Sequence, residues 1–401
     1  MLRRYRDLLA NDGLVLISVP NIQHFSVIKS LLRGDFMYQP SGLLDGTHLR
    51  FFTYMSFAKL MLDAGFLPRI EDRIRSGEAQ HLVEPAAPLL THCRVHPDTA
   101  LEPLDTYQYV VSGSRLPDPP AGYAAEPITF VACVNDDDQL ESNLLRSPCL
   151  DPGTPHEIIL MRRQTSAADG FNTALEKARH DLVVFVQQDI YLPRGWDSQF
   201  LRQFQEAERQ LTSVGVAGVF GYRFGPDGKT DLGRVLDRQT LYDLPAALPA
   251  EADGLDEIVL AVRRGTPLRF DPRLGFHLYG ADICLSARGQ GLPVAVLDAP
   301  CLHNSLFAYL SPEFHQARER LLAKWPDIRP LHSSMGQLDT MEPQPVPPTW
   351  AEDLRERSSQ LECDLAIVRE QLDDRLRHIA NMEASRFWRL RNLVHRVLRR
   401  P

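Results

Sequence analysis

Apolar and polar residues alternate along the first part of the chain in a pattern that predicts strands and helices in succession. Residues 13–19 predict a buried strand, residues 55–66 predict a helix that ends at Gly65, and residues 107–114 predict a final strand. Strand and helix signals of this kind indicate an α/β arrangement. We therefore expect a first structural piece over residues 1–115.

The periodic pattern stops and then restarts further along the chain. Residues 116–127 contain four prolines and predict a linker. Beyond it the chain is expected to form a strand, a helix, a strand, a helix and a strand, over residues 128–134, 138–147, 157–163, 166–180 and 181–189. Strands joined by crossover helices favour a mainly parallel sheet flanked by helices, with the ligand site at the carboxyl ends of the strands. We expect this second domain to cover residues 128–335.

The last part of the chain has a different character. Residues 336–350 are proline-rich and predict a second linker, and residues 351–401 predict a helical, basic tail. In this tail, apolar residues follow a short heptad spacing at Leu361, Leu365, Val368 and Leu372. We favour a helix packed on its own domain over a coiled coil. Residues 386–400 contain six arginines and no acid, which fits either a solvated tail or contact with an anionic membrane surface or an acidic protein.

Composition narrows the classes of protein that fit this pattern. The chain has 401 residues, 44% of them hydrophobic, and a net charge of −8. An acidic balance argues against a nucleic-acid binder, because phosphate neutralisation needs a basic surface. The six cysteines include no C-x-x-C pair, which argues against a zinc cluster or a disulfide framework. With neither a signal peptide nor an apolar run of about 18 residues, we expect a cytoplasmic protein, peripheral to a membrane if the basic tail binds one.

The stretches "LVLISVPN", "LLDGTHLRFFT" and "MLDAGF" within residues 1–115 resemble the carboxyl-terminal half of a class I S-adenosylmethionine-dependent methyltransferase. In that family the cofactor lies on a glycine-rich turn after the first strand. No such turn precedes this segment, and the G-x-G at Gly289–Gly291 is interpreted as a helix end and turn. The resemblance therefore implies a truncated piece that does not bind S-adenosylmethionine, in which His48 and Arg50 are structural or acceptor-side groups.

A buried strand in the second domain delivers polar residues to its end. In "VVFVQQDIYLP" the apolar run is followed by Gln187, Gln188 and Asp189. Together with "VACVND", "SAADGFNTALEKARH", "FHLYGADICLSARGQGL" and "CLHNS", this stretch resembles a family 2 glycosyltransferase of the GT-A fold, of the streptomycin-biosynthesis type. The resemblance implies a nucleotide-diphospho-sugar transferase fold over residues 128–305.

The resemblance also implies how a nucleotide-sugar donor is held. In the family a D-x-D motif at this strand end holds a divalent metal and the ribose, and here the motif reads Gln187-Gln188-Asp189. We expect Mn²⁺ or Mg²⁺ at Asp189 and His303, because hard oxygen ligands and few protein groups suffice for these ions. The implied donor contacts are Asn135, Asp136, Asn172, Gln188 and Asp189.

For an inverting transfer, a carboxylate must accept the proton of the attacking hydroxyl. The resemblance implies Asp282 as this base, at an exposed helix start. It places Trp196 and His277 beside the acceptor, which is a glycan, a lipid-linked sugar or a small molecule.

Each of these residues also has a structural interpretation. Asp136 and Asp282 fit helix caps, Trp196 fits a packing residue, and His303 fits a buried histidine with satisfied hydrogen bonds. What favours the site is the expected convergence of Asp189, Asp282 and His303 at strand ends of one sheet.

Three hypotheses follow. The first is a metal-assisted glycosyltransferase. The second is a non-catalytic module that binds sugar nucleotides or glycans, and the third is a scaffold for polysaccharide assembly. Methylation, as a subunit of a methyltransferase, ranks last.

Overall fold

The computed structural model describes residues 2–10, 12–93, 95, 97–116, 126–244, 247–305 and 310–342, together with 369, 371–372 and 375–377. The chain divides into two compact units, Met1–Pro343 and Gln344–Pro401. Most of the predicted linkers and nearly all of the predicted basic tail, including its heptad positions other than Leu372, lie outside the described residues. No helix within the described ranges is long and apolar enough to cross a membrane.

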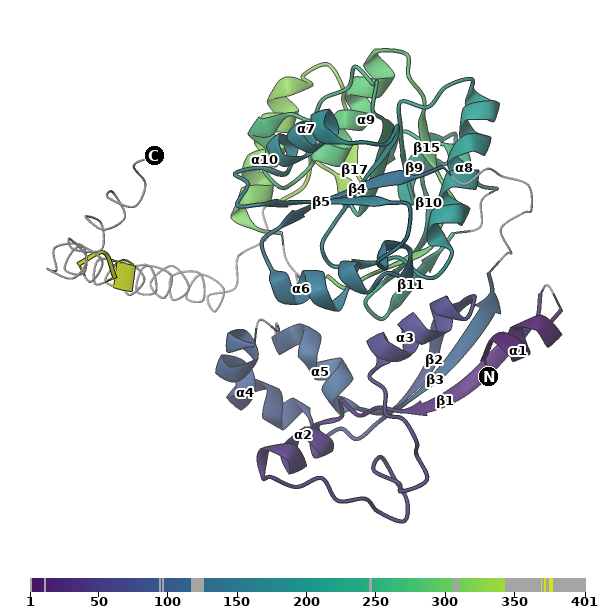
Figure 1. The fold of residues 1–401 in the computed structure, drawn as a ribbon, viewed down its shortest axis with the longest axis vertical. Coiled ribbons are helices and arrows are strands. Elements are labelled where there is room, and N and C mark those ends of the chain that lie inside the picture. The colour runs from purple at the N-terminus through teal and green to yellow at the C-terminus, as the bar shows by residue number, and fades with distance from the viewer. Residues whose placement is uncertain are drawn as a thin grey trace, which may run out of the picture. The chain divides into compact units, whose positions relative to one another are not determined.

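The first 115 residues form a small antiparallel sheet with helices (Figure 1). Strand order is β1-β3-β2, and strands are present at both predicted positions. The expectation that residues 13–19 are buried is wrong, since Leu14 and Leu16 are 63% and 70% exposed. The helix ends as predicted, because a φ of +82° at Gly65 turns the chain out of α3. The elements are α1 (Leu2–Leu8), β1 (Leu14–Pro20), α2 (Phe25–Leu32), α3 (Tyr54–Asp63), β2 (Phe66–Arg75), α4 (Gln80–His92), α5 (Pro97–Asp105) and β3 (Thr106–Arg115).

A seven-stranded sheet forms the centre of the following region, in the order β12-β15-β8-β14-β6-β4-β5. Its strands are β4 (Ile128–Val134), β5 (Glu157–Arg162), β6 (Leu182–Val186), β8 (Val216–Gly218), β12 (Ala250–Glu251), β14 (Val259–Arg263) and β15 (Val294–Val296). The helices are α6 (Asp137–Ser142), α7 (Ala167–Lys177), α8 (Trp196–Leu211), α9 (Tyr279–Gly289) and α10 (Pro312–Lys324). The strands and helices predicted between residues 128 and 189 are all present.

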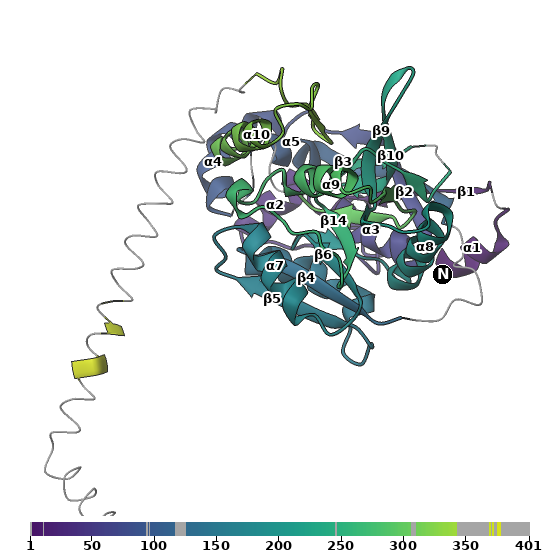
Figure 2. The ribbon, with the colours of Figure 1, turned by 90° about the horizontal axis from the view of Figure 1, so that it is seen from above.

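The expectation of a mainly parallel sheet is confirmed for five of the seven strands, since β4, β5, β6, β8 and β15 run in the same direction. Strands β5, β4 and β6 are parallel, but β14 runs antiparallel to both β6 and β8 (Figure 2). The sheet is therefore mixed. Because β14 is reversed, the residues that precede it lie at the same edge as the residues that follow β4 and β6.

Strand β6 shows how the apolar pattern builds this sheet. Leu182, Val184 and Val186 belong to one hydrophobic cluster, and Val183 and Phe185 belong to another. Alternate residues of a strand point to opposite faces, so both faces of the strand are buried. Helix α8 contributes to the first cluster, and helices α7 and α9 contribute to the second.

A second sheet lies beside the first, with strand order β13-β9-β10-β16-β7 and β11 paired to β10. Its strands are β7 (Ile190–Tyr191), β9 (Phe220–Gly225), β10 (Gly228–Asp237), β11 (Thr240–Asp243), β13 (Gly254–Leu255) and β16 (Cys301–His303). A hairpin of β17 (His332–Ser333) and β18 (Gly336–Gln337) follows α10. His303 therefore lies in a different sheet from the strand that leads to Asp189.

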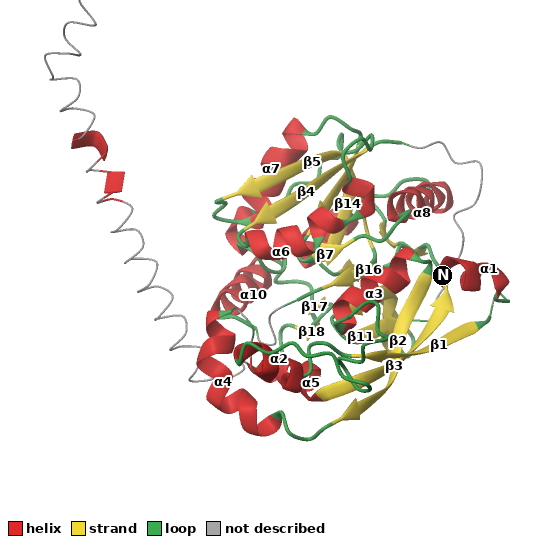
Figure 3. Cartoon of the chain, turned by 60° about the horizontal axis from the view of Figure 1, so that its bottom comes forward, coloured by secondary structure: helices red, strands yellow, loops and turns green. Residues whose placement is uncertain are grey.

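The first 115 residues pack against this second sheet (Figure 3). One hydrophobic cluster contains Tyr54 and Tyr109 from the first piece together with Tyr191, Leu236 and Leu302. The Asp63 carboxylate accepts hydrogen bonds from the Tyr191 hydroxyl, at 2.7 Å, and from the Arg194 N–H, at 3.0 Å. Apolar packing and charge-assisted hydrogen bonds thus join the two regions.

Replacing Asp63 with alanine is expected to lower the free energy of unfolding by about 1–3 kcal/mol, because the Tyr191 hydroxyl and the Arg194 N–H each lose their acceptor. Urea denaturation measures the change. Asp7, an exposed aspartate of α1, provides the matched control as Asp7→Ala. Equal stability of the two variants would show that the Asp63 contacts contribute nothing.

Candidate functional site

The carboxyl ends of two parallel strands carry the first cluster of polar residues. Asn135 and Asp136 follow β4, and Gln188 follows β6. The side-chain oxygen Oε1 of Gln188 accepts hydrogen bonds from the backbone N–H groups of Asn135 and Asp136, both at 3.0 Å. The side-chain amide Nε2 of Gln188 donates to the Asn135 side-chain oxygen. The structure thus brings these three predicted donor-binding residues together. The Asp136 carboxylate accepts the N–H of Gln139 at 3.1 Å and so also caps α6.

Asp189 and His303 meet at the same edge, as the sequence predicts. The His303 Nε2 lies 3.6 Å from the Asp189 Oδ2, and the His303 Nδ1 lies 3.2 Å from the Asp237 Oδ1. Strand β16 pairs with β10 in parallel, which places His303 opposite Asp237. Sequence reasoning missed Asp237, whose only signal is its position at the end of a strand.

The charges of this triad stabilise one another. Burial by itself would lower the pKa of His303, but the carboxylates of Asp189 and Asp237 raise it to about 10. Burial would raise the pKa of Asp189, but the nearby His303 leaves it below its usual range. At neutral pH, His303 is therefore an imidazolium held between two carboxylates.

A divalent metal at the predicted site would be held by the Asp189 carboxylate and the His303 Nε2, and Asp237 at the His303 Nδ1 would orient the ring. Metal binding would displace the proton from the imidazole. Within the described part of the chain, no group of three or more histidine, cysteine, aspartate or glutamate side chains is arranged to hold a metal ion. The triad is an ion-pair cluster.

Asp282 lies in a different environment from the one predicted. It is the fourth residue of α9 and is fully buried, so the expectation of an exposed carboxylate at a helix start is wrong. The Lys324 ammonium lies 2.8 Å from this carboxylate, and the Trp325 indole N–H donates to it at 2.9 Å. Lys324 also reaches Asp271, at 3.0 Å. Asp282 thus ties α9 to the end of α10, and its contacts do not include Asp189 or His303.

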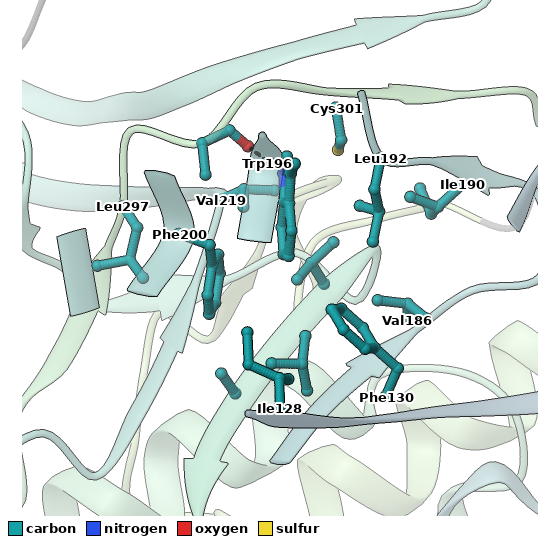
Figure 4. Packing of buried hydrophobic residues seen from close by; sticks show 14 of the residues in the cluster. Ile128, Phe130, Val186, Ile190, Leu192, Trp196, Phe200, Val219, Leu297 and Cys301 are labelled. Carbon is teal, nitrogen blue, oxygen red and sulfur yellow. Dashed lines mark hydrogen bonds between the residues drawn. The ribbon is translucent and has the colours of Figure 1, made fainter. Parts of the chain in front are cut away.

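Trp196 is a core residue. Its ring is 2% exposed, stacks on Phe200 at a centroid distance of 4.5 Å, and donates through its indole N–H to the Ala299 carbonyl at 3.0 Å (Figure 4). A ring enclosed in this way cannot stack on an acceptor sugar. The prediction failed because the apolar side of a tryptophan packs equally well on a protein core.

Asn172 and His277 also have structural partners. The Asn172 amide donates to the Phe270 carbonyl at 2.9 Å and accepts the Phe270 N–H at 3.0 Å, so it holds the chain before α9. The His277 Nε2 lies 3.2 Å from the Ser311 hydroxyl, and burial lowers the pKa of His277. His277 lies two residues before the start of α9, and its acceptor-side role stays a prediction.

Glu257 is a second residue that sequence reasoning missed. It precedes β14, and because β14 is antiparallel to β6, this position lies at the edge that carries Gln188. The Gly280 N–H donates to the Glu257 Oε1 at 3.0 Å. No strand was predicted over residues 259–263, so the acidic pair Asp256-Glu257 in front of it was overlooked.

Comparison with known proteins gives one family match. Residues 129–325 match the model of a family described as "Glycosyltransferase like family". The matched residues include every predicted site residue, from Asn135 to His303. A protein of Fuscovulum blasticum named "ATP synthase subunits region ORF 6" is 29% identical over 175 residues, which cover 41% of this chain and 68% of that protein.

Several solved structures of glycosyltransferases also overlap part of the chain. GalNAc-T7 with UDP, GalNAc and Mn²⁺ is 10% identical over 51% of this chain and 49% of its own, with a TM-score of 0.35. Residues 1–349 of TarS from S. aureus, in complex with UDP-GlcNAc, are 11% identical over 51% and 67%, with a TM-score of 0.33. The mannosyltransferase PcManGT from Pyrobaculum calidifontis, with GDP-Man and Mn²⁺, is 14% identical over 51% and 63%, with a TM-score of 0.30. The chain spans about half the length of the GalNAc-T7 structure.

Proposed function

We propose that this protein transfers a sugar from a nucleoside-diphosphate sugar to a hydroxyl group of a glycan, a lipid-linked sugar or a small molecule. The observation that carries the proposal is the gathering of Asn135, Gln188, Asp189 and His303 at one edge, inside the region that matches the glycosyltransferase-like family. The streptomycin-biosynthesis type is a finer proposal that rests on the sequence resemblance alone.

The amides and carboxylates at the strand ends suit the donor. Uridine and guanosine nucleotides present hydrogen-bond donors and acceptors on the base and hydroxyls on the ribose, which amide and carboxylate side chains recognise. In the proposed complex, Asn135, Asp136, Gln188 and Asp189 contact this part of the donor. Displacement of the diphosphate in one step by the acceptor oxygen inverts the anomeric carbon, and we propose an inverting transfer. Asp189 and His303 are the residues that would hold a divalent metal, which would stabilise the charge of the leaving diphosphate.

A second candidate is a module that binds a sugar nucleotide without turnover. The observation that favours it is the ion pair of Asp282 with Lys324, which engages the carboxylate that the sequence offers as the base. Steady release of nucleoside diphosphate from a donor requires an enzyme, so a hydrolysis assay separates the two. Assembly of partners through the carboxyl-terminal tail is compatible with either function.

Thermal unfolding in the presence of a panel of sugar nucleotides tests the proposed donor. At a concentration about 100 times its Kd, a true donor is expected to add about 2.7 kcal/mol to the free energy of unfolding, because it binds only the folded state. Mn²⁺ and a chelator form separate arms of the panel. S-adenosylmethionine is expected to give no stabilisation, and a shift with it would favour the methyltransferase interpretation of residues 1–115.

The matched variants are Gln188→Ala, which removes the side chain that joins the two strand ends, and Gln210→Ala, on an exposed position of α8. The first is expected to lose the donor effect and the second to keep it. If no UDP-, GDP- or dTDP-sugar stabilises the unaltered protein, the proposed function is wrong.

A further inference from the structure

Glu257 lies directly beside the proposed donor site. Pairing of β14 with β6 continues one residue past the strands, since the Gln187 N–H donates to the Ile258 carbonyl at 3.2 Å. Glu257 is the preceding residue, so the antiparallel register places it next to Gln188. This carboxylate therefore reaches the edge from a different strand than Asp189 does.

The start of α9 holds this carboxylate in place. The Gly280 N–H donates to the Glu257 Oε1 at 3.0 Å. A Cβ atom at position 280 would lie 2.7 Å from the Glu257 Cγ, so only glycine leaves room for the side chain in its present position. Among the described residues no cation forms an ion pair with Glu257, in contrast to Asp282, which is paired with Lys324. Glu257 as a residue is partly buried.

The charge state of Glu257 suits proton transfer near neutral pH. Burial and the Asp256 carboxylate raise its pKa to about 8, although the Gly280 and Tyr279 N–H groups act in the opposite direction. The other titratable groups that face it are the Tyr279 phenol and the Cys284 thiol, both on α9. Burial raises the pKa of Tyr279 above its usual range and that of Cys284 to about 12, so both are neutral between pH 6 and 9.5. A base whose pKa is close to the working pH is the most efficient one.

We propose that Glu257 is the catalytic base of the transferase proposed above, on which this inference rests. Its carboxylate takes the proton from the acceptor hydroxyl while the oxygen forms a bond to the anomeric carbon of the donor sugar. The bond from that carbon to the diphosphate oxygen breaks, and the diphosphate leaves with the electron pair. The protonated Glu257 then returns its proton to solvent, so the step is balanced without any other reactant.

A purely structural role is the alternative, since Glu257 also binds the start of α9, where no side chain caps the helix. The variant Glu257→Gln separates the two roles. A glutamine oxygen still accepts the Gly280 N–H, so folding and donor binding are preserved, but an amide cannot accept a proton from the acceptor.

The experiment uses the full chain with UDP-glucose, UDP-N-acetylglucosamine, GDP-mannose and dTDP-glucose as donors and water as the acceptor. Release of nucleoside diphosphate is followed between pH 6 and 9.5. For the unaltered protein we expect the rate to rise with an apparent pKa near 8. For Glu257→Gln we expect a loss of about 10²- to 10⁴-fold and no such rise, because a general base typically contributes that factor. The Kd of the donor for Glu257→Gln, obtained from its thermal stabilisation of that variant, is expected to lie within twofold of the Kd for the unaltered protein.

Three more variants complete the test. Glu176→Gln, at an exposed position of α7, is the matched control and is expected to keep the full rate. Gly280→Ala is expected to slow the reaction, because the added methyl group displaces the Glu257 side chain.

If the unaltered protein binds no donor, the proposed function is wrong, and the proposed role of Glu257 is wrong with it. If the unaltered protein turns over a donor and Glu257→Gln keeps its rate and pH profile, the base is not Glu257. Loss of turnover in Asp282→Asn, with Glu257→Gln unaffected, would assign the role to Asp282 instead.

Discussion

Replacing Lys324 with methionine is expected to lower the free energy of unfolding by about 3–5 kcal/mol. Lys324 lies 2.8 Å from the fully buried Asp282 carboxylate and 3.0 Å from Asp271. The variant leaves Asp282 with the Trp325 indole as its remaining side-chain donor. A buried carboxylate without a cation costs several kcal/mol, so the loss exceeds the value of one hydrogen bond. Urea denaturation at pH 7 measures it.

Two variants serve as controls for the Lys324 result. Lys177→Met, at an exposed position of α7, is expected to change the stability by less than about 0.5 kcal/mol. The double variant Asp282→Asn with Lys324→Met is expected to recover part of the loss, because a neutral amide can still accept from Trp325. A loss below about 1 kcal/mol in Lys324→Met would show that water reaches and solvates Asp282.

Raising the pH is expected to destabilise the protein through His303. The Asp189 and Asp237 carboxylates raise the pKa of His303 to about 10, above the ordinary value of 6.5. A group with a raised pKa in the folded state stabilises the fold fully below its unfolded value, and this stabilisation is lost as the pH rises through the folded value. At about 1.4 kcal/mol per pH unit, the rise from 6.5 to about 10 corresponds to a contribution of about 5 kcal/mol, which declines between about pH 6.5 and pH 10.

Comparison with a variant isolates this contribution, since tyrosines, lysines and cysteines also titrate near pH 10. In His303→Gln the free energy of unfolding is expected to be lower at pH 6 and to fall less steeply between pH 7 and 10. His81→Gln, at an exposed position of α4, is expected to retain the slope of the unaltered protein. Parallel curves for the unaltered protein and His303→Gln would mean that His303 is neutral in the folded state.

The sequence predicted much of the fold because the signals for individual elements are local. Apolar runs such as residues 182–186 and the left-handed turn at Gly65 depend on neighbours within a few residues. Strand direction depends on the whole topology. The reversal of β14 against its neighbours is not visible in its own apolar pattern, so the sequence did not predict it.

The candidate site was predicted where it depends on strand ends and missed where it depends on distant partners. Asn135, Gln188, Asp189 and His303 follow or end strands, and the structure brings them to one edge. The environment of Asp282 is set by Lys324, 42 residues further along the chain, on a helix whose packing no spacing rule reveals. The role of Asp282 as a base stays a prediction, and Glu257 is the alternative candidate.

The short strand β7 lies between the candidate site and the first 115 residues. Asp189 immediately precedes it, and its last residue, Tyr191, is buried against α3 and bonded to Asp63. A fragment limited to the family-matched residues 129–325 would therefore expose Tyr191, Leu236 and Leu302 to water. Such a fragment is expected to precipitate or self-associate, and crystallisation trials and binding assays alike should retain the amino-terminal region.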